Sequence, residues 1–216
     1  MLKKVTGIIT DFDNTLVQTQ KFVKDHLYHT CTRLKISAPK NSVIYAVLKK
    51  NLPFEEIFSK LFGKDLGEKV LAAYREDAMN TPYTATSGAH ELISTAKQKE
   101  IPVIIVSNRT NMLAERLQQA GFNPKDFVNF IAPAIKKPNI GAYTEALAEL
   151  ATHKAQPKTT LIIGDSLDDF LALPENLKDN FLAVVTGPNT KEEFYKLGVS
   201  ADNVLKSLVD FNNTLF

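Results

Sequence analysis

The sequence has a single cysteine and no long apolar run. With Cys31 alone, no disulfide can form within the chain, which excludes a disulfide framework and favours a reducing compartment. No stretch approaches the ~18 uncharged apolar residues of a transmembrane helix. The apolar run at 5–10 is too short for the core of a signal peptide, and two aspartates follow it. We therefore expect a cytoplasmic protein with no membrane partner.

Neither sign of charge dominates the chain. There are 26 lysines and arginines against 24 aspartates and glutamates, a formal net charge of +2. This balance gives no indication of nucleic-acid binding, so we expect no nucleic-acid partner. Hydrophobic residues make up 44% and charged residues 23%, as in an average globular protein, which excludes a disordered tail or a collagen-like fibre. The 216 residues allow a full core and one insert of modest size.

Short apolar runs rich in β-branched residues recur along the chain, and each ends at a polar residue. They lie at 5–10, 102–106, 127–131, 160–163 and 181–185. Continuous runs of this length are typical of strands that are buried on both faces of a parallel sheet. Helical patterns lie between them, at 89–99, 111–120 and 141–152. This alternation predicts an α/β fold with a doubly wound, Rossmann-like parallel sheet, in which ligands bind at the carboxyl ends of the strands.

The segment 19–83 interrupts the alternation of strands and helices. Its apolar residues recur at helical spacing, and Pro39, Pro53 and Gly63 divide it. We predict three or four short helices that form a small all-helical domain, inserted after the first strand. The predicted domains are therefore a catalytic core of residues 1–18 and 84–216 and a helical cap of residues 19–83. Because both ends of the insert adjoin the ligand crevice, we expect it to act as a mobile lid.

The first candidate site is a pair of aspartates, Asp11 and Asp13, directly after the first apolar run. Two carboxylates at this spacing, just past a buried strand, can face the same ligand. They can bind a hard cation through oxygen, or divide the roles of nucleophile and proton donor. The alternative is an acidic turn that caps the next segment.

Polar groups also follow three later runs. Asp165 follows the fourth run, and Asp169 lies four residues further on. The segment 107–110 ends the second run, where hydroxyl and amide donors at a helix N-terminus suit a phosphate. The lysine pair at 136–137 follows the third run and can neutralise a phosphate. Each motif alone has a structural alternative, as a helix N-cap or as surface lysines. Together, all four motifs fall at the carboxyl ends of predicted parallel strands.

The order of these motifs resembles the haloacid dehalogenase superfamily of phosphohydrolases. The matching segments are Asp-x-Asp-x-Thr at 11–15, Ser-Asn at 107–108, Lys-Pro at 137–138 and Gly-Asp-Ser-x-x-Asp at 164–169. The helical insert and the stretch 83–92 resemble the phosphoglycolate-phosphatase-like branch, which has a helical cap. The proline after Lys137 favours this lysine over Lys136. The chain departs from the family at 139–141, where Asn-Ile-Gly replaces a segment that often holds a second proline and an acid.

The resemblance implies a mechanism and a set of site residues. Asp11 would attack phosphorus and form an aspartyl-phosphate, and Asp13 would protonate the leaving oxygen and then activate water. Ser107 and Lys137 would complete the catalytic set by binding the transferring phosphoryl group. The substrate-binding residues would be Thr15, Asn108 and Arg109. The cofactor would be Mg²⁺, held by Asp11, the main-chain carbonyl of Asp13 and Asp165, with support from Asp169.

The expected function is Mg²⁺-dependent hydrolysis of a phosphate monoester, and the expected partner is a small phosphorylated metabolite. Asp13 favours this chemistry, because dehalogenases and phosphonate hydrolases of the superfamily lack an acid at that position. We expect a monomer or a weak homodimer. Two alternatives stay open: a sugar phosphomutase, which would share all four motifs, and a non-catalytic phospho-aspartate regulatory domain, which the helical insert disfavours.

Overall fold

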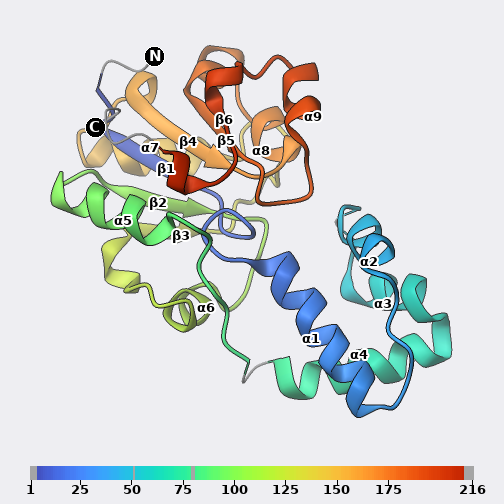
Figure 1. Ribbon diagram of the computed structural model, residues 1–216. Helices are drawn as coiled ribbons and strands as arrows, with labels where there is room; N and C mark the ends of the chain where they lie inside the picture. The colour runs from blue at the N-terminus through green and yellow to red at the C-terminus, as the bar shows by residue number, and fades with distance from the viewer. Residues whose placement is uncertain (1–3, 51, 79–80, 212–216) are drawn as a thin grey trace. The chain divides into compact units, whose positions relative to one another are not determined.

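The chain forms two compact units in a computed structural model that describes residues 4–50, 52–78 and 81–211 (Figure 1). The first unit consists of Met1–Gln18 and Thr84–Phe216, and the second is Thr19–Tyr83. None of the helices in the described ranges combines the length and hydropathy that crossing a bilayer requires.

The first unit contains a parallel sheet, which in the described part of the chain has six strands in the order β3-β2-β1-β4-β5-β6. Figure 1 shows β1 in blue between β2 in green and β4 in orange. The strands are β1 (Gly7–Thr10), β2 (Val103–Val106), β3 (Asn129–Ile131), β4 (Thr160–Gly164), β5 (Phe181–Val184) and β6 (Val204–Leu205). The predicted doubly wound parallel sheet is confirmed. Strand β6 was not among the predicted strands, because a run of two residues carries no detectable period.

Helices cover the sheet, which explains why every residue of β1, β2, β4 and β5 is buried. They are α5 (Ala89–Gln98), α6 (Leu113–Gln119), α7 (Thr144–Thr152), α8 (Leu167–Leu171) and α9 (Lys191–Lys196). Helix α7 begins three residues later than its pattern predicts, because Gly141 has φ +108 and the chain turns before the helix. Gly7 allows close packing under β1, since a Cβ there would lie 2.8 Å from the Ala155 Cβ.

The second unit is all helical, as its sequence predicts. Its helices are α1 (Thr19–Arg33), α2 (Asn41–Leu48), α3 (Phe54–Phe62) and α4 (Lys64–Ala78). Helices α3 and α4 approach closely at Gly67, where a Cβ would lie 2.7 Å from the Phe58 carbonyl oxygen. The core of this unit consists of Leu27, Cys31, Ile44, Val47, Ile57, Phe58, Val70, Leu71 and Tyr74. This core holds the unit together by burial of apolar surface.

Candidate active site

The site begins where β1 and β4 end side by side. Thr10 of β1 is opposite Ile163 of β4, and the Asp11 amide donates to the Ile163 carbonyl at 2.8 Å. Asp11 and Asp165 are the residues that directly follow these two strands. In the observed strand order, β2 and β3 lie on one side of β1, and β4, β5 and β6 lie on the other. Open α/β sheets bind ligands at such a switch point, beyond the carboxyl ends of the strands.

Lys137 is the cation at the centre of the site. Its buried ammonium donates to Asp11 Oδ1 at 2.6 Å, to Asp169 Oδ1 at 2.6 Å and to the Val106 carbonyl at 2.9 Å. Burial would lower the pKa of Lys137, but the charges of Asp11 and Asp169 outweigh burial and hold this pKa well above its usual value. Lys136 instead reaches the Asn108 carbonyl at 3.4 Å, outside the carboxylate cluster. Lys137 is therefore the lysine that meets the carboxylates.

Three buried carboxylates converge next to this ammonium. One oxygen each from Asp11, Asp165 and Asp169 lies within 4.8 Å of the others. Burial raises the pKa of Asp11 to about 7; the charges of Asp169 and Asp13 add to this, while Lys137 opposes it. Burial, with the nearby charges of Asp11 and Asp169, also raises the pKa of Asp165 well above its usual value. Burial is the first cause of both shifts and the neighbouring carboxylates add to it, so a cation beside the cluster would favour the ionised forms.

The donor set fits Mg²⁺. When all three carboxylates are ionised, one ammonium leaves an excess of two negative charges, the charge that a divalent cation cancels. All the donors are oxygens, which hard cations prefer, and the cluster holds neither Cys nor His to favour zinc.

Asp169 is held on both of its oxygens. Oδ2 accepts from the Ser166 amide at 3.1 Å and hydroxyl at 2.6 Å, in a capping box that starts α8. Oδ1 accepts from Lys137 and, at 3.3 Å, from the Tyr143 hydroxyl. Gly164 leaves room for this carboxylate, since a Cβ there would lie 2.5 Å from its Cγ. Both oxygens are thus engaged by the protein, which favours a supporting role for Asp169 beside a metal.

A further loop, which follows β5, lies next to Asp165 and was not assigned to the site from the sequence. The Thr186 hydroxyl, after β5, donates to the Asn14 carbonyl at 2.6 Å. A Cβ at Gly187 would lie only 1.6 Å from Asp165 Oδ2. The sequence pattern that could have identified this loop is the one that identified the other four motifs, a polar residue directly after a predicted parallel strand. Gly187 therefore defines the space in which the Asp165 carboxylate lies.

Replacing Gly187 with alanine is expected to weaken Mg²⁺ binding about tenfold or more, because the new methyl group displaces the Asp165 carboxylate. Isothermal titration calorimetry with Mg²⁺ measures the effect. Gly198→Ala is the matched control: Gly198 has φ +91, and a Cβ there would meet no other described residue within 4 Å, so this variant strains the backbone without touching the site. Unchanged Mg²⁺ affinity in Gly187→Ala, or an equal loss in both variants, would show that Gly187 does not shape the site.

The other residues expected in the site lie around the same strand ends. Ser107 is buried directly after β2, and its hydroxyl accepts from the Arg109 amide at 3.2 Å. The Thr15 hydroxyl lies 3.4 Å from Asp11 Oδ2 and 3.3 Å from Asp165 Oδ1. The Thr15 side chain thus contacts the carboxylate cluster.

Asn108 joins two loops of the site. Its Nδ2 donates to the Lys137 carbonyl at 2.8 Å, and its Oδ1 accepts from the Lys137 amide at 3.0 Å. This pair of bonds fixes the main chain of Lys137 relative to the end of β2. The structure thus places the Asn108 side chain on the lysine loop, a contact that the motif spacing did not indicate.

Asp13 lies apart from the three clustered carboxylates, in an ion pair. Arg109 Nη2 donates to Asp13 Oδ1 at 2.6 Å, and Arg109 Nε donates to Asp13 Oδ2 at 3.1 Å. The guanidinium also lies 5.5 Å from the centre of the Phe12 ring. Two loops that follow adjacent strands, β1 and β2, are joined by this pair.

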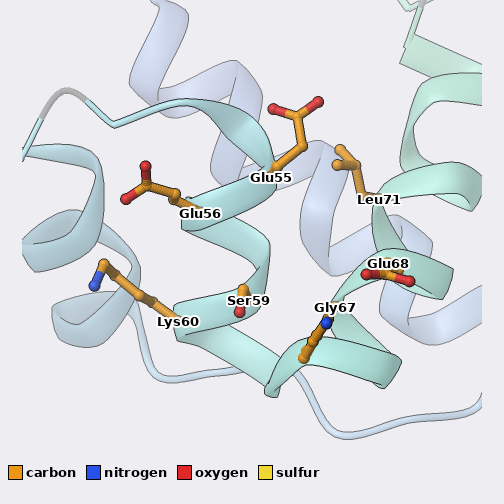
Figure 2. Close-up of a pocket in the computed structure, with 8 residues that line it drawn as sticks. Glu55, Glu56, Ser59, Lys60, Gly67, Glu68 and Leu71 are labelled. Carbon is orange, nitrogen blue, oxygen red and sulfur yellow. The ribbon is translucent and has the colours of Figure 1, made fainter.

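A shallow pocket in the second unit has different properties. Figure 2 shows it between α3 and α4, and its volume is about 350 Å³. Its charged side chains are solvent exposed and carry both signs. The lining residues are Glu55, Glu56, Ser59, Lys60, Lys64, Gly67, Glu68 and Leu71. It lacks buried, convergent polar groups such as those of the carboxylate cluster in the first unit.

Comparisons with known proteins match the chain to one family model and to solved structures of the same fold. The family model of the haloacid dehalogenase-like hydrolases matches residues 8–175. A HAD family hydrolase from Deinococcus radiodurans with bound phosphate and sodium is 19% identical, with a TM-score of 0.76 over 98% of this chain and 95% of its own. A candidate β-phosphoglucomutase from Thermotoga maritima is 18% identical, with a TM-score of 0.75 over 98% of each chain.

CbbY from Rhodobacter sphaeroides, solved in complex with phosphate, is 18% identical, with a TM-score of 0.65 over 96% of each chain. At these identities the solved structures establish a shared fold and no more. Among curated proteins, none matches the sequence significantly.

Proposed function

Because the chain belongs to the haloacid dehalogenase-like hydrolase family, we propose that it hydrolyses a small phosphate monoester through an aspartyl-phosphate on Asp11. The observation that carries the proposal is the Lys137 ammonium, 2.6 Å from both Asp11 and Asp169 in a buried carboxylate cluster. Phosphoryl transfer depends chiefly on positioning and on neutralising charge at the phosphoryl oxygens, and this cluster offers both.

The proposed reaction has two steps. An Asp11 oxygen attacks phosphorus, the bond between phosphorus and the leaving oxygen breaks, and Asp13 supplies the proton that this oxygen takes up. Asp13 then removes a proton from a water molecule, which attacks phosphorus and releases Asp11 and inorganic phosphate. The Lys137 ammonium and the Ser107 hydroxyl hold the transferring phosphoryl group. Thr15 and Asn108 orient the carboxylates and the lysine, as their contacts indicate.

Mg²⁺ is the proposed cofactor, held by Asp11, the Asp13 carbonyl and Asp165, with Asp169 in support. When bound, it supplies positive charge that stabilises the phosphoryl oxygens. The protein's own part is to present the carboxylates in a buried cluster, where their interaction with a cation is stronger than in water.

Release of inorganic phosphate from a panel of sugar phosphates, nucleotides and phosphoglycolate, with and without Mg²⁺, tests the proposed function. Exhaustive chelation is expected to abolish hydrolysis, and Mg²⁺ is expected to restore it, because three buried carboxylates repel the phosphoryl group when only one lysine balances them. Zn²⁺ is not expected to substitute, since the cluster has no nitrogen or sulfur ligand. Full activity after chelation, or activation by Zn²⁺ alone, would contradict the metal assignment.

A sugar phosphomutase is the second candidate, because it needs the same nucleophile, acid and lysine, and because the candidate mutase from Thermotoga maritima shares the fold. The two functions differ in the fate of the aspartyl-phosphate. A phosphatase transfers it rapidly to water, whereas a mutase loses it slowly to water and depends on a sugar bisphosphate.

A further inference from the structure

The ion pair of Arg109 and Asp13 has a consequence for the proposed reaction. Both carboxylate oxygens of Asp13 accept from the same guanidinium, at 2.6 and 3.1 Å. The side chains are only 21% and 29% exposed, so solvent screens the pair poorly. Bidentate pairs of this kind are among the strongest charge-assisted hydrogen bonds in proteins. The pair therefore fixes where the Asp13 carboxylate lies before substrate binds.

This ion pair conflicts with the role proposed for Asp13 as proton donor and base. To give a proton to the leaving oxygen, Asp13 must first hold that proton on one of its oxygens, and a protonated carboxyl cannot accept both hydrogen bonds that Arg109 donates to the carboxylate. The pair must therefore loosen during the reaction. A poorly exposed guanidinium that loses a bidentate partner incurs a cost unless another anion replaces that partner.

The replacement anion must come from the leaving part of the substrate. In the proposed reaction, Lys137 and Ser107 hold the transferring phosphoryl group beside Asp11. Asp13 acts at the oxygen on the other side of the breaking bond, and Arg109 contacts Asp13. An anion that reaches Arg109 is thus attached to the leaving group.

We propose that Arg109 exchanges Asp13 for a second anionic group on the substrate, a carboxylate or a second phosphate carried by the leaving group. This inference rests on the proposed phosphatase function and narrows its substrate class to phosphate monoesters with a second anion. Binding of the correct substrate then frees Asp13, so the acid becomes available only when the second anion is in place.

Paired substrates test the exchange. The carboxylate pair is 3-phosphoglycerate with glycerol 3-phosphate, and the phosphate pair is fructose 1,6-bisphosphate with fructose 6-phosphate. In at least one pair, the native protein is expected to have a kcat/KM about ten- to a hundredfold higher for the member that carries the second anion, the range that a charge-assisted hydrogen bond supplies. The pair that shows the preference identifies the second anion as carboxylate or phosphate.

Arg109→Gln is expected to bring the ratio of the two kcat/KM values close to one. Arg109→Lys is expected to keep part of the preference, because lysine retains the positive charge but cannot donate the two parallel hydrogen bonds of a guanidinium. Lys136→Gln is the matched control, since it removes a neighbouring positive charge that contacts Asn108 instead of Asp13. It is expected to keep the preference of the native protein. Thermal unfolding of all three variants verifies that they fold.

The outcomes separate this inference from the proposed function. If the native protein hydrolyses none of these substrates and none of the wider panel, both are wrong. If it hydrolyses members of the panel but prefers the second anion in neither pair, the exchange is wrong and the phosphatase function stands. The same conclusion follows if Arg109→Gln keeps the native preference or lowers kcat/KM equally for both members of each pair. A weaker inhibition of Arg109→Gln by inorganic phosphate, with the preference intact, would place Arg109 on the transferring phosphoryl group and also overturn the exchange.

Discussion

Asp11→Asn is expected to lower turnover at least about a thousandfold while the protein keeps its fold. The substitution is nearly isosteric, and an amide oxygen can still accept the Lys137 hydrogen bond that Asp11 Oδ1 accepts at 2.6 Å. What is lost is the carboxylate that attacks phosphorus. Phosphate release by the purified variant and its thermal unfolding midpoint together measure the effect.

Asp168→Asn is the matched control for this experiment. It makes the same chemical change in a neighbouring acid of the Gly-Asp-Ser-x-x-Asp segment, one that lies outside the cluster of three carboxylates. It is expected to keep turnover within about threefold of the native protein, as is usual for substitutions away from the reacting groups. Substantial turnover in Asp11→Asn, or equal losses in both variants, would show that Asp11 is not the nucleophile.

Lys137→Met is expected to have the second largest effect, on activity and stability together. The buried ammonium meets two carboxylates, and breaking a buried pair by removing one partner costs about 3–5 kcal/mol. Methionine fills a similar volume, so most of the loss is electrostatic. We expect turnover to fall by about a hundredfold or more, because the phosphoryl group loses its closest positive charge.

Mg²⁺ distinguishes this electrostatic account from simple loss of packing. A divalent cation cancels part of the charge that Lys137 balanced, so Mg²⁺ is expected to raise the unfolding temperature of Lys137→Met more than that of the native protein. Lys136→Met is the matched control, and we expect it to lose little activity, because Lys136 lies outside the carboxylate cluster. A larger loss in Lys136→Met than in Lys137→Met would reverse the assignment of the functional lysine.

The sequence predicts the sheet and the meeting of its acidic loops for a simple reason. Continuous apolar runs predict parallel strands, and parallel strands bring their carboxyl ends to one edge, so Asp11 and Asp165 had to approach each other. The spacing of four residues from Asp165 also identifies Asp169 as part of the site and not as an unrelated surface acid.

Other features depend on which loops are neighbours and on where side chains point, and a sequence pattern contains neither. The pair of Asp13 and Arg109 joins residues that are 96 positions apart, and it forms because the loops after β1 and β2 are neighbours. The clamp of Asn108 on Lys137 likewise depends on which way an amide points. Strand β6 is two residues long and is defined by its pairing with β5, not by its own composition. The closure of the helical unit over the crevice stays a prediction.

The central claim, an aspartyl-phosphate on Asp11, is tested most directly by trapping it. Asp13→Asn lacks the base that activates water, so with Mg²⁺ and an aryl phosphate, whose leaving group needs no added proton, it is expected to accumulate a phosphorylated form. Intact-protein mass spectrometry then shows the mass of one added phosphoryl group, and peptide mapping places that group on Asp11. The account predicts this adduct in Asp13→Asn and none in the double variant that also carries Asp11→Asn. A phosphoryl group on any other residue, or an adduct that persists in the double variant, would contradict it.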